Sequence, residues 1–101
     1  MRLTPNQTKI ICESTAKYFG TQAHIWLFGS RVDDQAKGGD IDLYIESPIP
    51  NADDLISAKL QLLRELHKKL GEQKIDVVIQ GSATADLPIH RIAKQSGVLL
   101  L

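Results

Sequence analysis

Apolar residues recur at helical spacing in three stretches of the chain. The first opens on Thr4-Pro5-Asn6-Gln7, a capping-box sequence with proline at the position that a helix tolerates, and Gly20 suits its end. The second follows Asn51 as the expected N-cap and ends before Gly71. Its predicted apolar stripe consists of Leu55, Ile56, Leu62, Leu63, Leu66 and Leu70. Two long amphipathic helices are therefore expected.

The third helical stretch is short. Asp86 is its expected cap, and Gly97 is expected to end it after Ser96. Its predicted inward face consists of Ile89, Ile92 and Ala93. The apolar tail 98–101 follows, and the sequence leaves two interpretations of it: a short edge strand or part of an interface.

Three other stretches have the pattern of β-strands. Residues 24–28 are short, apolar and rich in β-forming side chains. Residues 40–45 alternate strictly between apolar and polar or aromatic positions. Residues 74–80 place Ile75, Val77 and Ile79 on one face, with Asp76 and Val78 on the other. The predicted order is α-β-β-α-β-α. It indicates a mixed α/β (α+β) fold in which helices cover a small sheet, as one domain over residues 1–101.

Composition and charge exclude some classes of function. The 101 residues include 12 basic and 12 acidic side chains, so the formal charge is zero, which argues against a protein that grips a long nucleic-acid backbone. No apolar run approaches the roughly 20 residues of a membrane span. Cys12 is the single cysteine and cannot form an internal disulfide. A cytoplasmic location is expected.

Two aspartates stand on the polar face of the second strand. Asp40 and Asp42 are two residues apart, which places their Cα atoms about 6.5–7 Å from each other on one face. Two such charges repel by about 2–3 kcal/mol at an effective dielectric of ~20. Mg²⁺ is the simplest compensation, because it binds carboxylate oxygens and keeps positions open for phosphates. Asp76 interrupts the apolar third strand, and if the strands are neighbours it joins the pair. Three carboxylates can hold two metal ions.

A turn suited to phosphates follows the first strand. Gly29-Ser30 lets backbone N–H groups and a hydroxyl approach phosphate oxygens closely. Arg31 offers a charge-assisted contact to a triphosphate, although a surface salt bridge explains it equally well.

Together these residues carry a family resemblance. Leu27-Phe28-Gly29-Ser30-Arg31 followed by Gly39-Asp40-Ile41-Asp42-Leu43 resembles the signature of the DNA polymerase β-type nucleotidyltransferase superfamily. The short chain and the isolated aspartate in Lys74-Ile75-Asp76-Val77-Val78 resemble its minimal nucleotidyltransferase (MNT) branch. The resemblance covers nearly the whole chain. Nine residues, 31–39, separate Gly-Ser from Asp-x-Asp, where ten are common in that branch.

The resemblance implies a function for each motif. Gly29 and Ser30 would hold the nucleoside triphosphate, Asp40 and Asp42 would bind metal ions, and Asp76 would help bind metal and activate the acceptor hydroxyl. Small MNT proteins are typically antitoxins paired with a HEPN-domain ribonuclease. Their activity is the transfer of AMP from ATP to a tyrosine hydroxyl of that toxin, so ATP, Mg²⁺ and a HEPN partner are expected.

Alternatives remain for these motifs. Asp-x-Asp also occurs on solvated strand faces, in glycosyltransferases and in calcium loops, although the further ligands of a calcium loop are missing. The domain could neutralise its partner by docking alone, which the nine-residue spacing favours and the three aspartates oppose. Transfer to a small molecule or an RNA end is a third interpretation. A chain this short leaves little room for such an acceptor pocket.

Overall fold

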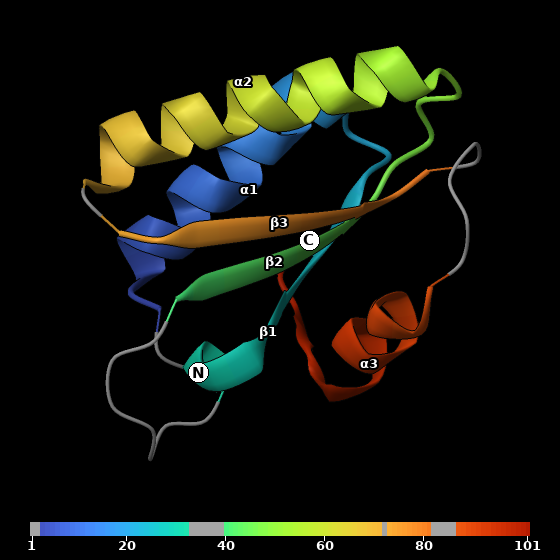
Figure 1. Ribbon diagram of the computed structural model, residues 1–101. Coiled ribbons are helices and arrows are strands. Elements are labelled where there is room, and N and C mark those ends of the chain that lie inside the picture. Colours follow the sequence, from blue (N-terminus) through green and yellow to red (C-terminus); the bar gives the residue numbers. More distant parts are fainter. Residues whose placement is uncertain (1–2, 33–39, 72, 82–86) are drawn as a thin grey trace.

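The computed structural model describes residues 3–32, 40–71, 73–81 and 87–101 (Figure 1). In chain order its elements are α1 (Pro5–Phe19), β1 (His24–Phe28), the single-turn 3₁₀ helix η1 (Gly29–Val32), β2 (Ile41–Glu46), α2 (Ala52–Leu70), β3 (Ile75–Gln80), α3 (Pro88–Ser96) and β4 (Val98–Leu99). The mixed α/β fold expected from the sequence is confirmed. The apolar tail contributes the edge strand that one of its two interpretations predicted, and the interface interpretation stays a prediction.

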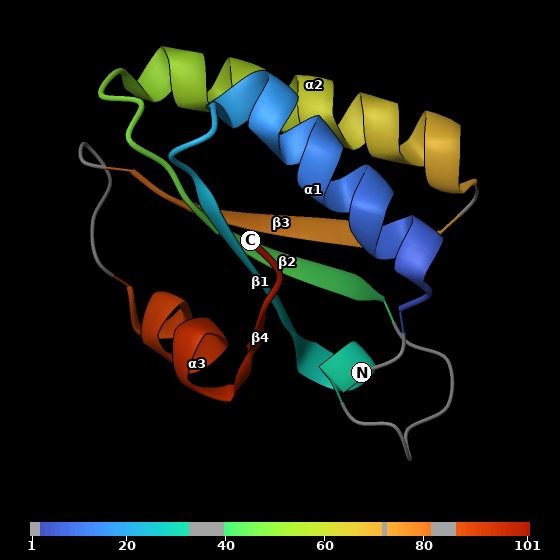
Figure 2. The same ribbon diagram turned by 180° about the vertical axis from the view of Figure 1, so that it is seen from behind.

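The four strands form one sheet in the order β3-β2-β1-β4. Helix α2 connects β2 to β3, which run parallel, and the other two pairs are antiparallel. Figures 1 and 2 show α1 and α2 on one face of the sheet and α3 on the other. The strands are therefore covered by two helices on one side and partly open on the other.

The core lies between the sheet and the pair α1 and α2. Alternation directs one set of strand side chains toward these helices, where they are buried. The largest contributors are Ile11, Phe19, Ile25, Leu27, Ile41, Leu43, Ile45, Leu62 and Leu66. The opposite set of strand side chains, which includes the aspartates, faces the side of α3.

Both long helices begin as the sequence predicts. The Thr4 hydroxyl accepts from the Gln7 backbone N–H at 3.1 Å, and the Gln7 side chain accepts from the Thr4 N–H at 2.9 Å, which completes the capping box. The Asn51 side-chain oxygen accepts hydrogen bonds from the backbone N–H groups of Asp53, at 2.8 Å, and Asp54, at 3.3 Å, in the first turn of α2. Gly20 and Gly71 end the helices with positive φ angles of 89° and 84°.

The buried stripe of α2 differs in part from the prediction. Its buried residues are Leu55, Ala58, Leu62 and Leu66, and Ile56 is 56% exposed. The reason is helical geometry: a stripe through Leu55 continues three, seven and eleven residues later, and Ile56 lies about 100° away from it. The assignment of Ile56 to the core was wrong.

The last helix also departs from the prediction. It begins at Pro88 with Leu87 at the N-cap, so Asp86, which lies outside the described residues, is not the cap. Its buried face consists of His90 and Ala93, whereas Ile89 and Ile92 are 39% and 56% exposed. The imidazole of His90 stacks on Tyr44 at 5.6 Å and accepts from the Leu87 N–H at 3.1 Å, so an amphipathic ring takes the inward position. Within the described ranges, no helix combines the length and apolarity needed to cross a membrane.

Candidate active site

Three aspartates meet at the start of two parallel strands. The register of β2 and β3 places Asp42 directly beside Asp76, and Asp40 immediately precedes β2. One carboxylate oxygen from each lies within 4.8 Å of the others. The convergence expected from the alternating patterns, if the strands were neighbours, is present in the structure.

Burial of the neighbouring residues fixes the direction of these carboxylates. Ile41 and Leu43 are fully buried under the helices, so Asp42 between them points to the opposite face. Ile75 and Val77 are likewise buried under the helices, so Asp76 between them points to the opposite face, where its side chain is exposed. The triad therefore opens to solvent on the α3 side of the sheet.

The triad is electrostatically strained. Burial, followed by repulsion from Asp76 and Asp40 and a hydrogen bond with the Asp76 carboxyl, raises the pKa of Asp42, and Lys74 opposes the shift. The Lys74 ammonium lies 3.5 Å from the nearest Asp40 oxygen. The sequence pattern predicted no function for this lysine, although its position two residues before Asp76 was a usable signal. Because the Lys74 side chain is exposed, solvent weakens its compensation of the repulsion among the three carboxylates.

Gly29 lies directly against the triad. Its φ of 78° is in the region that favours glycine, and an added Cβ would lie 3.1 Å from Asp42 Cγ and overlap its Oδ2. Two independent constraints thus require glycine at the end of β1. The Gly29 backbone approaches the Asp42 carboxylate closely because glycine carries no side chain.

Ser30 and Arg31 follow Gly29 within η1, which packs against β2. The predicted contacts of their side chains with phosphate lie outside what the structure describes, as do residues 33–39. These contacts remain predictions.

A layer of aromatic side chains continues along the same face of the sheet. Trp26 and Tyr44 lie side by side at 5.3 Å between ring centroids, and His90 of α3 stacks on Tyr44. The Lys94 ammonium lies 5.2 Å above the Trp26 ring and 3.2 Å from a carboxylate oxygen of Glu46. These contacts hold α3 on the sheet beside the triad. Trp26 is half-buried and packs rather than projecting freely.

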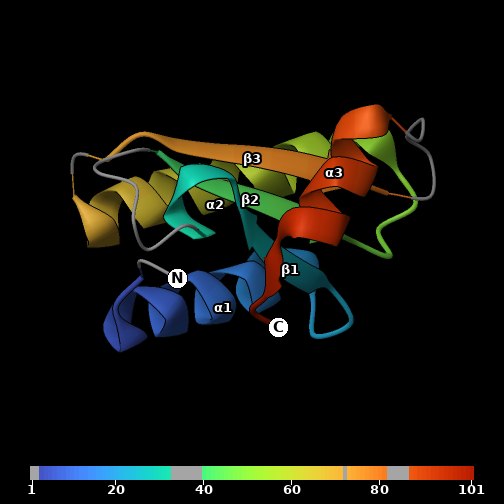
Figure 3. The same cartoon turned by 90° about the horizontal axis from the view of Figure 1, so that it is seen from below.

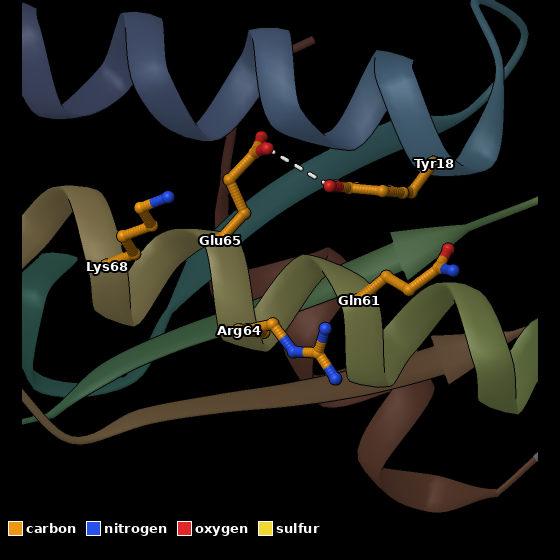
Figure 4. Close-up of a pocket in the computed structure, with 5 residues that line it drawn as sticks. All are labelled: Tyr18, Gln61, Arg64, Glu65 and Lys68. Carbon is orange, nitrogen blue, oxygen red and sulfur yellow. Dashed lines mark hydrogen bonds between the residues drawn. The ribbon is translucent and has the colours of Figure 1, made fainter.

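A separate cleft of about 230 Å³ lies on the helical side, between α1 and α2 (Figure 4). Tyr18 donates to the Glu65 carboxylate at 3.0 Å, and Lys17 pairs with the same oxygen at 3.0 Å. These contacts tie the two helices together. The sheet separates this cleft from the aspartates, so the cleft is not part of the candidate metal site.

The donor set of the triad suits a hard cation. Carboxylate oxygens are the protein ligands that Mg²⁺ prefers, and it retains positions for water and phosphate oxygens. Burial and, after it, repulsion from Asp76 and Asp40 raise the pKa of Asp42, and a divalent ion would relieve that repulsion. Asp40, Asp42 and Asp76 could therefore hold Mg²⁺.

Comparison with known proteins agrees with this geometry. Residues 11–101 match the family described as polymerase beta, nucleotidyltransferase. A search among curated proteins gave no match. The matched residues include the Gly-Ser turn, all three aspartates and every strand. The chain belongs to the polymerase beta nucleotidyltransferase family.

Proposed function

We propose that this domain is a Mg²⁺-dependent protein adenylyltransferase that moves AMP from ATP to a hydroxyl group of a HEPN-family ribonuclease toxin, a tyrosine in the first instance, and thereby acts as its antitoxin in the cytoplasm. The observation that supports it most is the meeting of Asp40, Asp42 and Asp76 beside the open backbone of Gly29. The HEPN partner comes from the resemblance to MNT proteins.

The three aspartates and Gly29 each have a defined task in the proposed reaction. Asp40, Asp42 and Asp76 would hold Mg²⁺, which supplies charge neutralisation at the triphosphate. The Gly29 backbone orients the phosphates next to the carboxylates. The acceptor oxygen attacks the α-phosphorus, the bond to the bridging oxygen breaks, and pyrophosphate leaves. Exposed Asp76, at the edge of the triad, accepts the proton of the acceptor hydroxyl.

An acceptor carried by another protein fits the size of this domain. Helix α3 covers part of the sheet face onto which the triad opens, where it contacts β1, β2 and β3 (Figure 3). A formal charge of zero argues against a long RNA as the acceptor. A protein that supplies its own hydroxyl needs no enclosed pocket here.

Thermal unfolding with ATP, GTP, CTP and UTP, each with and without Mg²⁺, tests nucleotide use. A ligand at about 100 times its Kd adds roughly 2.7 kcal/mol. For a domain of this size, each kcal/mol raises the Tm by about 4–8 °C. We expect a shift that needs both ATP and Mg²⁺ and is lost in the Asp40→Asn, Asp42→Asn double variant. Absence of a shift with every nucleotide contradicts the proposal.

The second candidate is an antitoxin that neutralises by docking without catalysis. The nine-residue spacing between Gly-Ser and Asp-x-Asp, one fewer than is common, favours it. The same double variant separates the two functions in a toxin-neutralisation assay. Loss of neutralisation supports catalysis, and full neutralisation supports docking.

A further inference from the structure

Strand β3 forms one edge of the sheet and pairs on one side only. The carbonyls of Lys74 and Gln80 accept from β2 and the residue after it, each at 3.0 Å. Backbone groups alternate in direction along a strand, so Ile75, Val77 and Ile79 turn their N–H and C=O groups to the outer edge. Within the described ranges, no hydrogen bond uses these outward groups. The edge is a template for another strand.

An apolar groove accompanies this edge. A cavity of about 350 Å³ lies along β3, between α2 and the start of α3, and Val78 and Ile79 line it. Two strongly exposed apolar side chains border it: Ile56 of α2, 56% exposed, and Leu87, 50% exposed. An extended polypeptide could pair its backbone with the edge of β3 and place an apolar side chain in the cavity.

The same strand carries Asp76 of the triad. Asp76 and Val78 lie on the same face, two residues or about 6.5–7 Å apart. A strand added to the edge would lie about 4.8 Å from β3. A residue placed beside Asp76 would therefore present its side chain to the carboxylates, while its neighbour two positions away would lie beside Val78 and the groove.

We propose that the outer edge of β3 binds an extended segment of the acceptor protein, with the hydroxyl-bearing residue beside Asp76 and an apolar side chain two residues away in the groove. This inference rests on the function proposed above and adds how the acceptor is held. The groove is lined mostly by apolar side chains, with Lys59 as its one lysine, which suits an apolar polypeptide segment better than a nucleic-acid backbone.

A defined probe tests the docking. It is a nine-residue peptide of alternating valine and threonine with a central tyrosine, so that valine lies two positions from the tyrosine. Its partner peptide has proline on both sides of the tyrosine, which removes the N–H groups needed for pairing. With ATP labelled in the α-phosphate and Mg²⁺, we expect at least tenfold more labelling of the first peptide.

Variants of the domain provide the second arm. Ile56→Glu with Leu87→Glu is expected to reduce labelling at least tenfold and to leave the ATP-dependent rise in Tm unchanged. Leu99→Glu is the matched control, since Leu99 is 57% exposed but lies on β4 at the opposite edge. It should label the peptide within twofold of the parent protein. Amide exchange of Val77 and Ile79 should slow at least tenfold when the peptide binds, with or without nucleotide.

The outcomes separate the two proposals. Equal labelling of both peptides, or undiminished labelling by the double variant, overturns docking at β3 and leaves the transferase function intact. If ATP does not raise the Tm, the proposed function is overturned, and amide exchange alone then decides whether the peptide docks at β3. Unchanged amide exchange at Val77 and Ile79 overturns docking at β3. A dimer of this chain that Ile56→Glu with Leu87→Glu dissociates also overturns it, because the occupant is then a second copy.

Discussion

Replacement of Gly29 by alanine tests the geometry of the site most directly. The change adds one methyl group at a φ of 78° and against the Asp42 carboxylate. The positive φ costs roughly 1–2 kcal/mol for an alanine. The overlap with Asp42 Oδ2 obliges the carboxylate to move by about 1 Å to regain ordinary contact distance. The first cost affects folding, and the second affects the metal ligands.

Gly20→Ala separates these two effects. Gly20 has a φ of 89°, and nothing lies within 4 Å of a Cβ added there. Both variants should therefore lose about 1–2 kcal/mol of stability, or roughly 4–16 °C in Tm. Only Gly29→Ala should also lose metal affinity, by roughly 10–100-fold, the range found when the support of a metal ligand is removed.

The assay is calorimetric titration with Mn²⁺, which also prefers carboxylate oxygens, on the parent protein and both variants. Thermal unfolding of the same samples measures the shared backbone cost. Equal Mn²⁺ affinity in Gly29→Ala and Gly20→Ala would show that the contact of residue 29 with Asp42 has no bearing on the metal ligands.

Three further predictions concern stability. Asp42→Asn should raise the Tm without metal, measured by calorimetry at pH 7, because burial and repulsion disfavour this carboxylate. The Ser14 hydroxyl and then the Lys17 ammonium lower the pKa of Glu65 from 4.5 to about 2, so its ionised form stabilises the fold above about pH 4.5. The Tm difference between parent and Glu65→Gln should shrink as pH falls from 4.5 to 2, and a constant difference would contradict this. Asn51→Ala should cost about 1 kcal/mol, seen as a Tm lower by about 4–8 °C.

Local signals were sufficient for most of the elements. The capping box at Thr4 and the asparagine at 51 fix where the long helices begin, because each satisfies backbone N–H groups from its own neighbourhood. Strict alternation likewise predicted which face of its strand Asp42 would occupy. Asp42 and Asp76 meet because β2 and β3 pair in parallel. The sequence pattern could not predict that pairing, so the convergence of the aspartates was predicted only for the case that the two strands are neighbours.

The errors arose where tertiary contacts decide. Composition favours Ile92 over His90 as a core residue, yet the imidazole finds an aromatic partner and a backbone donor on the sheet, and the isoleucine does not. A two-residue strand such as β4 carries no periodicity, so its pairing with β1 lay beyond any pattern. Lys74 was missed because an isolated lysine has no motif, and only its distance to Asp40 gives it a function.

The parallel pairing of β2 and β3 also has a consequence for folding kinetics. Asp42 and Asp76 are 34 residues apart in sequence, with α2 between them, and they face each other only when β2 pairs with β3. The complete triad, and the repulsion between these two carboxylates, therefore belongs to the paired strands. A divalent ion bound there joins the two strands in the native state alone. Its kinetic signature is then slower unfolding with an unchanged folding rate.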